Sequence, residues 1–147
     1  RRKHADATLV IAGARVKTDL AGVIALGRVP LEELKRYYRE ATIFCMPSRS
    51  EPFGVAYVEA MAYALPIVAT EIGALPDMVS NGKNGFLVQP GDVDSLTQAL
   101  DSLLSDKQKR ARFGKISRQL AAERYNWDAV GKSMRKSIEP FLPSRQA

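Results

Sequence analysis

Short apolar runs alternate with helical patterns in the N-terminal part of the chain. Each run is bounded by Gly, Pro or polar residues and has the length and composition of a buried strand, at residues 8–13, 23–27, 42–47, 66–70 and 85–89. Between the second and third runs, PLEELKRYYREA has the spacing of an amphipathic helix that starts at Pro30. Strands that alternate with helices favour an α/β fold with a doubly wound parallel sheet.

After Pro90 the pattern is helical throughout. Residues 92–104, 108–125 and 128–141 have helical periodicity with no strand between them. We therefore expect a single domain, residues 1–147, with an α/β part at 8–89 and C-terminal helices at 92–141. The last residues, 143–147, are expected to fray, and Trp127 is interpreted as a packing residue.

The segment PFGVAYVEAMAYALPIVAT, residues 52–70, contains only one charged side chain, that of Glu59. Apolar residues surround Glu59 on every side at helical spacing, so we predict a helix that is buried all round. A buried carboxylate without donors costs several kcal/mol, so Glu59 must meet donors from the protein or from a ligand. A core ion pair with an arginine is the alternative to a ligand contact.

A second carboxylate, Glu51, stands eight positions before Glu59, where Pro and Gly indicate a turn into the helix. Eight helical rises cover about 12 Å, roughly the reach of a sugar linked through a diphosphate to a ribose. Between the two acids, the free amides of Gly54, Val55 and Ala56 would favour a phosphate. This order of groups matches a nucleotide-sugar, although Glu51 by itself is equally explained as an acid favoured at a helix N-terminus.

The loops that follow the predicted strands are candidate site elements. Gly13, Gly27, residues 48–54 and Gly73 each follow a strand directly. Ligands of doubly wound sheets bind outside the carboxyl ends of the strands, so we expect these four loops to converge on one crevice. The aromatic residues Tyr37, Tyr38 and Phe44 are interpreted as core.

Composition narrows the chemistry. With one Cys and one His in 147 residues, Cys45 is predicted to be a reduced, buried thiol, and neither a metal site nor a cofactor is proposed. The apolar runs fall short of the ~20 residues of a membrane span and no signal peptide is recognised, so we expect a cytoplasmic location.

The net charge of +6 is concentrated in residues 107–118 and 132–137. Such a basic face is most simply a solvated helix surface. Aromatic residues do not interleave with the cations as they do in single-strand binding grooves, so no nucleic acid is expected as a partner. Peripheral contact with an anionic membrane stays open.

The segment PSRSEPFGVAYVEAMAYALPIVAT resembles the E-x7-E segment of the GT-B retaining glycosyltransferases, glycosyltransferase family 4 or glycosyl transferases group 1. Many of these enzymes act in polysaccharide or glycolipid biosynthesis. The blocks LVIAG, GRVPLEELKRYYREATIFCMPS, GALPDMV and NGFLVQPGD resemble the same family in the same order, so the similarity runs over residues 8–125. The resemblance implies the Rossmann-like C-terminal half of a GT-B fold, which binds a nucleotide-diphosphate sugar and transfers the sugar with retention of configuration, without a metal ion.

The resemblance also implies roles for particular positions. Glu51 is similar to the first glutamate, which contacts hydroxyls of the transferred sugar and is the catalytic candidate, and Glu59 is similar to the second, which holds the ribose hydroxyls. The remaining positions contribute backbone: Phe53 and Gly54 to the sugar, Val55 and Ala56 to the phosphate, and Arg28 and Val29 to the nucleobase-edge loop. Asp77 stands where the family more often has a glutamate, in a turn that we interpret as structural.

The chain also departs from the family pattern. The expected first strand, the glycine-rich loop and a basic pair that grips the diphosphate do not precede residue 8, and Arg1, Arg2 and Lys3 do not replace them. The N-terminal acceptor domain is also missing, so we expect a fragment that is inactive by itself. Two alternatives stay open: a non-catalytic nucleotide-sugar binding module, and another GT-B enzyme such as a sugar-nucleotide epimerase.

Overall fold

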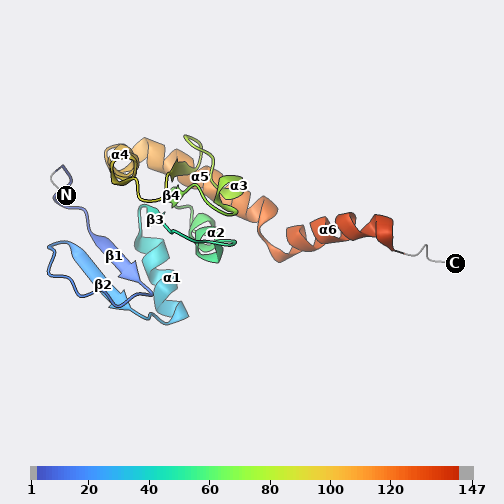
Figure 1. Cartoon of the computed structure of the whole chain (residues 1–147), viewed down its shortest axis with the longest axis horizontal. Coiled ribbons are helices and arrows are strands. Elements are labelled where there is room, and N and C mark those ends of the chain that lie inside the picture. Colours follow the sequence, from blue (N-terminus) through green and yellow to red (C-terminus); the bar gives the residue numbers. More distant parts are fainter. Residues whose placement is uncertain (1–2, 143–147) are drawn as a thin grey trace.

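The computed structural model of the protein describes residues 3–142. In that range five parallel strands form two sheets, a two-stranded β1–β2 and a three-stranded β3–β4–β5 (Figure 1). The α/β class with parallel strands is confirmed, and each strand lies inside its predicted run: β1 Leu9–Ala12, β2 Val23–Gly27, β3 Phe44–Met46, β4 Ile67–Thr70 and β5 Gly85–Val88. Arg1, Arg2 and the tail 143–147 lie outside the described residues.

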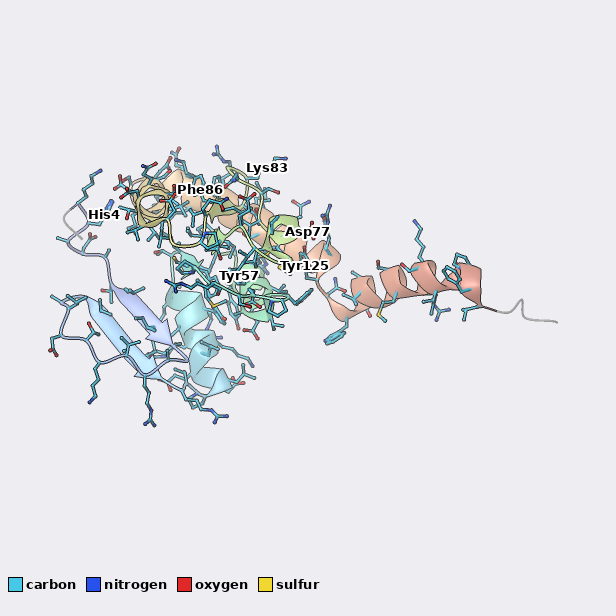
Figure 2. All side chains as sticks on the ribbon, in the orientation of Figure 1. His4, Tyr57, Asp77, Lys83, Phe86 and Tyr125 are labelled. Atoms are coloured by element: carbon cyan, nitrogen blue, oxygen red, sulfur yellow. The ribbon has the colours of Figure 1, made fainter. Side chains whose placement is uncertain are left out.

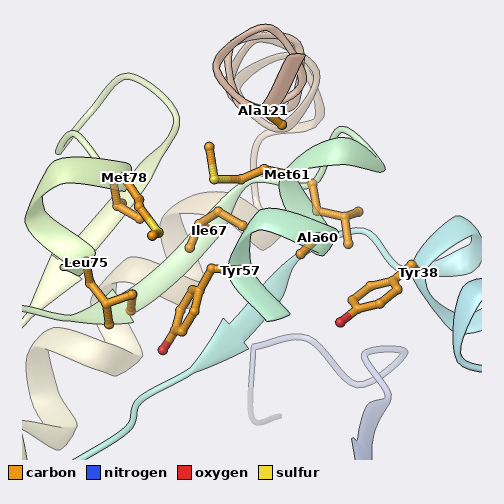
Figure 3. Close-up of a cluster of buried hydrophobic side chains, with 11 residues drawn as sticks. Tyr38, Tyr57, Ala60, Met61, Ile67, Leu75, Met78 and Ala121 are labelled. Carbon is orange, nitrogen blue, oxygen red and sulfur yellow. The ribbon is translucent and has the colours of Figure 1, made fainter. Parts of the chain in front are cut away.

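The three-stranded sheet carries the core. All four residues of its central strand β4 are buried, and its three apolar side chains alternate between two apolar clusters. Ile67 packs on one face with side chains such as Tyr57, Met61 and Leu75 (Figure 3). Val68 packs on the other face, with Leu103 and Phe113 among its neighbours. Both faces of this sheet are therefore covered, as is usual for parallel sheets.

The two-stranded sheet is much more open. Its strands pair in parallel, with Leu9 opposite Val23, but Leu9 is 52% exposed and Ile24 is 49% exposed. The prediction that every strand is buried is therefore wrong for β1 and for much of β2. The reason is that, among the described residues, β1 has a strand on one edge only and neither apolar cluster includes its side chains, so its faces are not covered.

Helix α1, Leu31–Glu40, begins directly after Pro30 as predicted. Helix α2, Val55–Ala62, is buried along one face only, through Tyr57, Ala60 and Met61. Val55 at its start is 62% exposed, so the prediction of a helix buried all round is wrong. The three buried residues fall at i, i+3 and i+4, which is the stripe of a helix that packs on one side of a sheet.

The helices of the C-terminal part confirm the predicted pattern. They are α4 Val93–Leu104, α5 Lys107–Arg124 and α6 Trp127–Ile138, with a short 3₁₀ helix η1 Glu139–Phe141. Asp92, Asp106 and Asn126 cap the three α-helices, each accepting a hydrogen bond from the backbone N–H three residues later. The four-residue helix α3, Leu75–Met78, was not expected and contains Asp77, whose carbonyl oxygen accepts a hydrogen bond from the Tyr125 hydroxyl at 3.2 Å.

Helix α6 points away from the rest of the molecule (Figure 1). None of its residues is buried, and Trp127 at its start is 89% exposed. The interpretation of Trp127 as a packing residue is therefore wrong for the described part of the chain. Its N-cap and helical periodicity form the helix, but burial needs a partner surface that residues 3–142 do not supply.

Candidate functional site

The candidate site is built around the loop 48–54, which connects β3 to α2. Glu51 lies in this loop, and the helix begins only at Val55. The separation of Glu51 and Glu59 is therefore not that of eight helical rises, because only the second half of the interval is helical. The two carboxylates nevertheless lie on either side of the α2 N-terminus along the chain, as the sequence predicts.

The loop 48–54 is held against the β4–α3 loop. The Thr70 hydroxyl donates a hydrogen bond to the Ser48 carbonyl oxygen at 2.6 Å. Further along, Gly73 has a positive φ of 52°, and a Cβ atom there would lie 2.1 Å from the Glu51 carbonyl oxygen. This close approach fixes the backbone of Glu51 beside the end of β4.

The other two predicted loops also meet each other. The amide of Gly13, after β1, donates a hydrogen bond to the carbonyl oxygen of Gly27, at the end of β2, at 2.7 Å. The four loops are thus brought together in two pairs, one at each sheet. No hydrogen bond described for residues 3–142 connects the two pairs, so convergence on one crevice stays a prediction.

Amide groups are free at the start of α2. The Gly54 carbonyl oxygen accepts hydrogen bonds from the amides of Tyr57 and Val58, at 3.0 Å and 3.3 Å. By contrast, the backbone hydrogen bonds of residues 3–142 include no acceptor for the amides of Gly54, Val55 and Ala56. No acidic residue stands in the first turn of the helix. The positive end of the helix dipole and three free donors can hold an anion such as a phosphate.

Glu59 meets a donor from the protein. The hydroxyl of Tyr38, on α1, donates a hydrogen bond to Glu59 Oε2 at 3.1 Å. Burial and the neighbouring Glu59 charge raise the pKa of Tyr38, so the phenol keeps its proton. No arginine forms an ion pair with Glu59 in the part of the chain that the structure describes. The sequence predicts a donor for Glu59, and in the structure this donor is the phenol of Tyr38. The sequence analysis interpreted Tyr38 only as a core residue.

The remaining predicted positions are less connected. Phe53 is 51% exposed in the loop before α2. Arg28 is exposed and Val29 partly buried, directly after β2. None of the interactions described for residues 3–142 joins Arg28 or Val29 to Glu51 or Glu59. Their role at a nucleobase stays a prediction.

Two other groups of interest lie outside this region. Cys45 is free, and burial raises the pKa of its thiol to about 11, which leaves the thiolate unpopulated at neutral pH. His4 contacts Asp101 on α4, with 2.8 Å between Nε2 and Oδ1. In residues 3–142, no cluster of three or more His, Cys, Asp or Glu side chains is arranged to hold a metal ion.

None of the helices within the described range is both long and apolar enough to cross a membrane. The basic residues of α6 are all exposed, and they are Lys132, Arg135 and Lys136. Their spacing of i, i+3 and i+4 places them on one side of a helix that is itself unburied. The charge is thus available at the surface, without a partner shown for it.

The fold, with its parallel strands and packed helices, is of the α/β class that the C-terminal domains of glycosyltransferases have. The chain belongs to the glycosyl transferases group 1 family, whose sequence model matches residues 1–120. The resemblance expected from the E-x7-E segment is confirmed, and the Rossmann-like domain is that of GT-B glycosyltransferases.

Particular relatives are similar over most of this chain. The sulfoquinovosyl transferase SQD2 of Arabidopsis thaliana is 38% identical over 112 residues, 74% of this chain and 22% of that protein. A GDP-mannose-dependent alpha-(1-6)-phosphatidylinositol monomannoside mannosyltransferase of Mycolicibacterium smegmatis is 32% identical over 100% of this chain and 43% of its own length. The chain thus spans less than half of each relative.

A solved structure matches the fold closely. Anabaena HepE, in complex with UDP-glucose, superposes with a TM-score of 0.72 at 26% identity and covers 82% of this chain and 33% of that chain. The likeness therefore extends over most of this chain and over about a third of that protein.

Proposed function

We propose that this chain is the donor-binding part of a retaining glycosyltransferase that takes a nucleotide-diphosphate sugar. The observation that carries the proposal is the set of free amides at the start of α2, flanked along the chain by Glu51 and Glu59. The family supports it, as does HepE, a structural neighbour that binds UDP-glucose. In this assignment the α2 amides hold the phosphate nearer the sugar, Glu51 contacts sugar hydroxyls and Glu59 contacts the ribose.

The mechanism that we propose is transfer on one face of the sugar. The bond between the anomeric carbon and the phosphate oxygen breaks, and the acceptor oxygen forms its bond on the same side. A phosphate oxygen of the leaving group takes the proton of the acceptor hydroxyl. The free amides of Gly54, Val55 and Ala56 stabilise the negative charge that develops on the diphosphate. Glu51 orients the sugar, which brings the reacting atoms into line.

The domain organisation is part of the same proposal. β1 and β3 each have a neighbouring strand on one edge only within residues 3–142. A further parallel strand between them would join the two sheets into one and enclose the exposed side chains of β1. A glycine-rich loop and basic pair after that strand would complete the diphosphate site. Because the relatives are much longer than this chain, we also propose a separate acceptor domain and no turnover by the 147-residue chain alone.

Two further parts of the proposal concern location and partners. We propose a cytoplasmic enzyme whose basic, exposed α6 can contact an anionic membrane surface. The alternatives, a binding module or an epimerase, differ in what the intact protein does with a donor and an acceptor. A module binds without turnover, and an epimerase changes the nucleotide-sugar without an acceptor.

The test separates the two glutamates by calorimetric titration of the intact protein. Glu59→Gln should weaken binding of both the nucleoside diphosphate and the nucleotide-sugar by roughly 1.5 to 3 kcal/mol, because charge-assisted hydrogen bonds to the ribose are lost. Glu51→Gln should leave nucleoside diphosphate affinity unchanged and reduce transfer, since its contact requires the sugar. Exposed Glu123, on α5, provides the matched control Glu123→Gln, which should change neither.

Equal losses for Glu51→Gln and Glu59→Gln toward the bare nucleoside diphosphate would contradict the order of groups along the ligand. Unchanged affinity in Glu59→Gln would remove the ribose role altogether. Sugar transfer by the 147-residue chain alone would contradict the need for further domains.

A further inference from the structure

Tyr38 belongs to the buried core and also contacts Glu59 of the candidate site. We propose that Tyr38 is a positioning residue, which orients the Glu59 carboxylate so that its second oxygen receives a ligand diol. This inference rests on the proposed function, because it assumes that Glu59 holds the ribose hydroxyls. It assigns a role on α1, outside the segment that carries both glutamates.

The geometry of the contact is specific. The Tyr38 hydroxyl lies 3.1 Å from Glu59 Oε2 and 3.5 Å from the Ala56 carbonyl oxygen, so it faces two successive turns of α2. Figure 3 shows Tyr38 reaching from α1 toward α2 at the edge of the core, near Ala60. The contact is thus made between two helices that are far apart in the sequence.

The ring of Tyr38 is itself held in place. It is 8% exposed, and it stacks on Tyr63 with 5.4 Å between centroids and 17° between planes. Phe44 packs against it at 6.1 Å and 44°. A ring fixed by two aromatic neighbours presents its hydroxyl in one place. The donor is therefore preorganised before any ligand arrives.

The Glu59 side chain needs such a donor. The terminal torsion of a glutamate has a broad energy profile, so a partly exposed carboxylate samples many orientations. A hydrogen bond from Tyr38 to Oε2 removes this freedom and leaves Oε1 with its acceptor capacity. Two adjacent hydroxyls of a ribose are two donors, which one oriented carboxylate can accept together. The loss of conformational freedom on binding is correspondingly reduced.

The protonation states suit this arrangement. Burial and the charge of Glu59 both raise the pKa of Tyr38, so the phenol is a donor at neutral pH. The pair thus consists of a neutral donor at Oε2 and a carboxylate, and Tyr38 brings no positive charge that would compete with the ligand at Oε1. An arginine in the place of Tyr38 would compete for both oxygens through its fork of donors.

The experiment uses the intact protein and a ligand that lacks the diol. UDP, ADP and GDP are titrated first, and the tightest binder is compared with its 2′,3′-dideoxy analogue in wild type, Glu59→Gln, Tyr38→Phe and the double variant. Tyr38→Phe should weaken the nucleoside diphosphate roughly tenfold, because the Glu59 carboxylate that accepts from the diol is no longer oriented. The dideoxy analogue should bind as before, because it has no diol to contact Glu59. In Tyr38→Phe/Glu59→Gln the loss should not exceed that of Glu59→Gln alone.

The matched control is Tyr37→Phe, which removes the adjacent hydroxyl on α1. That hydroxyl lies 3.5 Å from Glu33 and contacts neither α2 nor Glu59 in the described structure. Tyr37→Phe should therefore bind both ligands as wild type does.

The outcomes separate the inference from the proposed function. Equal weakening of both ligands by Tyr38→Phe would show a structural role only and overturn the inference. If Glu59→Gln weakens the nucleoside diphosphate but not the dideoxy analogue, and Tyr38→Phe weakens neither ligand, only the positioning role is wrong. If wild type and Glu59→Gln bind both ligands alike, the ribose assignment itself fails.

A second measurement covers the case in which Tyr38→Phe does not fold. With 3-fluorotyrosine incorporated only at position 38, the fluorine resonance should shift on addition of the nucleoside diphosphate and stay in place with the dideoxy analogue. The absence of a shift with the nucleoside diphosphate would contradict the inference.

Discussion

Strands β1 and β4 have similar sequences and different surroundings. β4 reads IVAT and is buried at all four positions, whereas β1 reads LVIA and is exposed at three of four. β4 has β3 on one edge and β5 on the other, and apolar clusters cover both of its faces. β1 has β2 on one edge only, among the residues described.

The comparison teaches that an aliphatic run specifies a parallel strand more firmly than it specifies burial. Hydrogen bonding to one neighbour is enough to extend the backbone of β1. Burial needs a second edge and two covered faces, which come from distant segments. The exposed side chains of β1 are therefore a surface that the α/β fold normally encloses.

The largest effect should come from removing the same side chain in the two sheets. Ile67→Ala in β4 should destabilise the chain by about 2 to 5 kcal/mol, because Ile67 is fully buried and a cavity remains. Ile24→Ala in β2 should cost less than about 1 kcal/mol, since Ile24 is 49% exposed. Urea unfolding followed by circular dichroism measures both.

Equal losses of stability in Ile67→Ala and Ile24→Ala would contradict the difference in burial between the two sheets. A second version compares Val10→Ala, in β1 itself, between the 147-residue chain and the intact protein, where a strand on the free edge of β1 should increase the cost. An unchanged small cost there would argue against the additional strand.

The next effect concerns the loops at the carboxyl ends of the two sheets. Gly73→Ala should cost roughly 2 to 4 kcal/mol, because a positive φ of 52° is combined with a Cβ 2.1 Å from the Glu51 carbonyl oxygen. Gly13→Ala should cost only roughly 1 to 2 kcal/mol, since its φ of 90° is unfavourable but the space around it is open. Thermal unfolding gives the stability difference, and Gly73→Ala should also reduce nucleotide-sugar transfer in the intact protein.

Similar stability losses in these two glycine variants would mean that the loops 48–54 and 71–74 are not as tightly packed as the structure shows. Normal transfer in Gly73→Ala would separate the loop packing from the position of Glu51.

The smallest effect concerns the contact between the N-terminal segment and α4 (Figure 2). Hydrogen bonds from His4 and then Lys3 lower the pKa of Asp101 below its ordinary value of about 3.9. A carboxyl group whose pKa is lowered in the folded state stabilises the fold at pH values above its ordinary pKa. This contribution to the free energy of unfolding is lost as the pH falls through the lowered pKa. The change in stability should be small because Asp101 and Lys3 are solvated.

Carbon-13 NMR of the Asp101 carboxyl group measures this pKa directly. His4→Ala should raise it, and His4→Ala with Lys3→Ala should raise it further. An identical titration in wild type and both variants would show that the contact does not persist in solution.

Much of the candidate site was accessible from the sequence because its signals are local. The turn residues before Val55 and the single acid in an apolar segment are visible within one short stretch, and they led to Glu51, Glu59 and the α2 amides. Tyr38 was missed as a partner of Glu59 because 21 residues separate them and each belongs to a different helix. Its only sequence signal was a second tyrosine beside a helical stripe, which core packing explains equally well.

The sequence by itself determined the order and nature of the strands and of the longer helices, since turn residues, caps and apolar periodicity act over a few residues. Pro30, Asp92, Asp106 and Asn126 set the starts of their helices in this way. Only the tertiary structure decided that the strands form two sheets, that α2 buries one face, that α6 lies unburied and that Tyr38 donates to Glu59. These features depend on which distant segments pack against one another, and local sequence patterns do not specify such contacts.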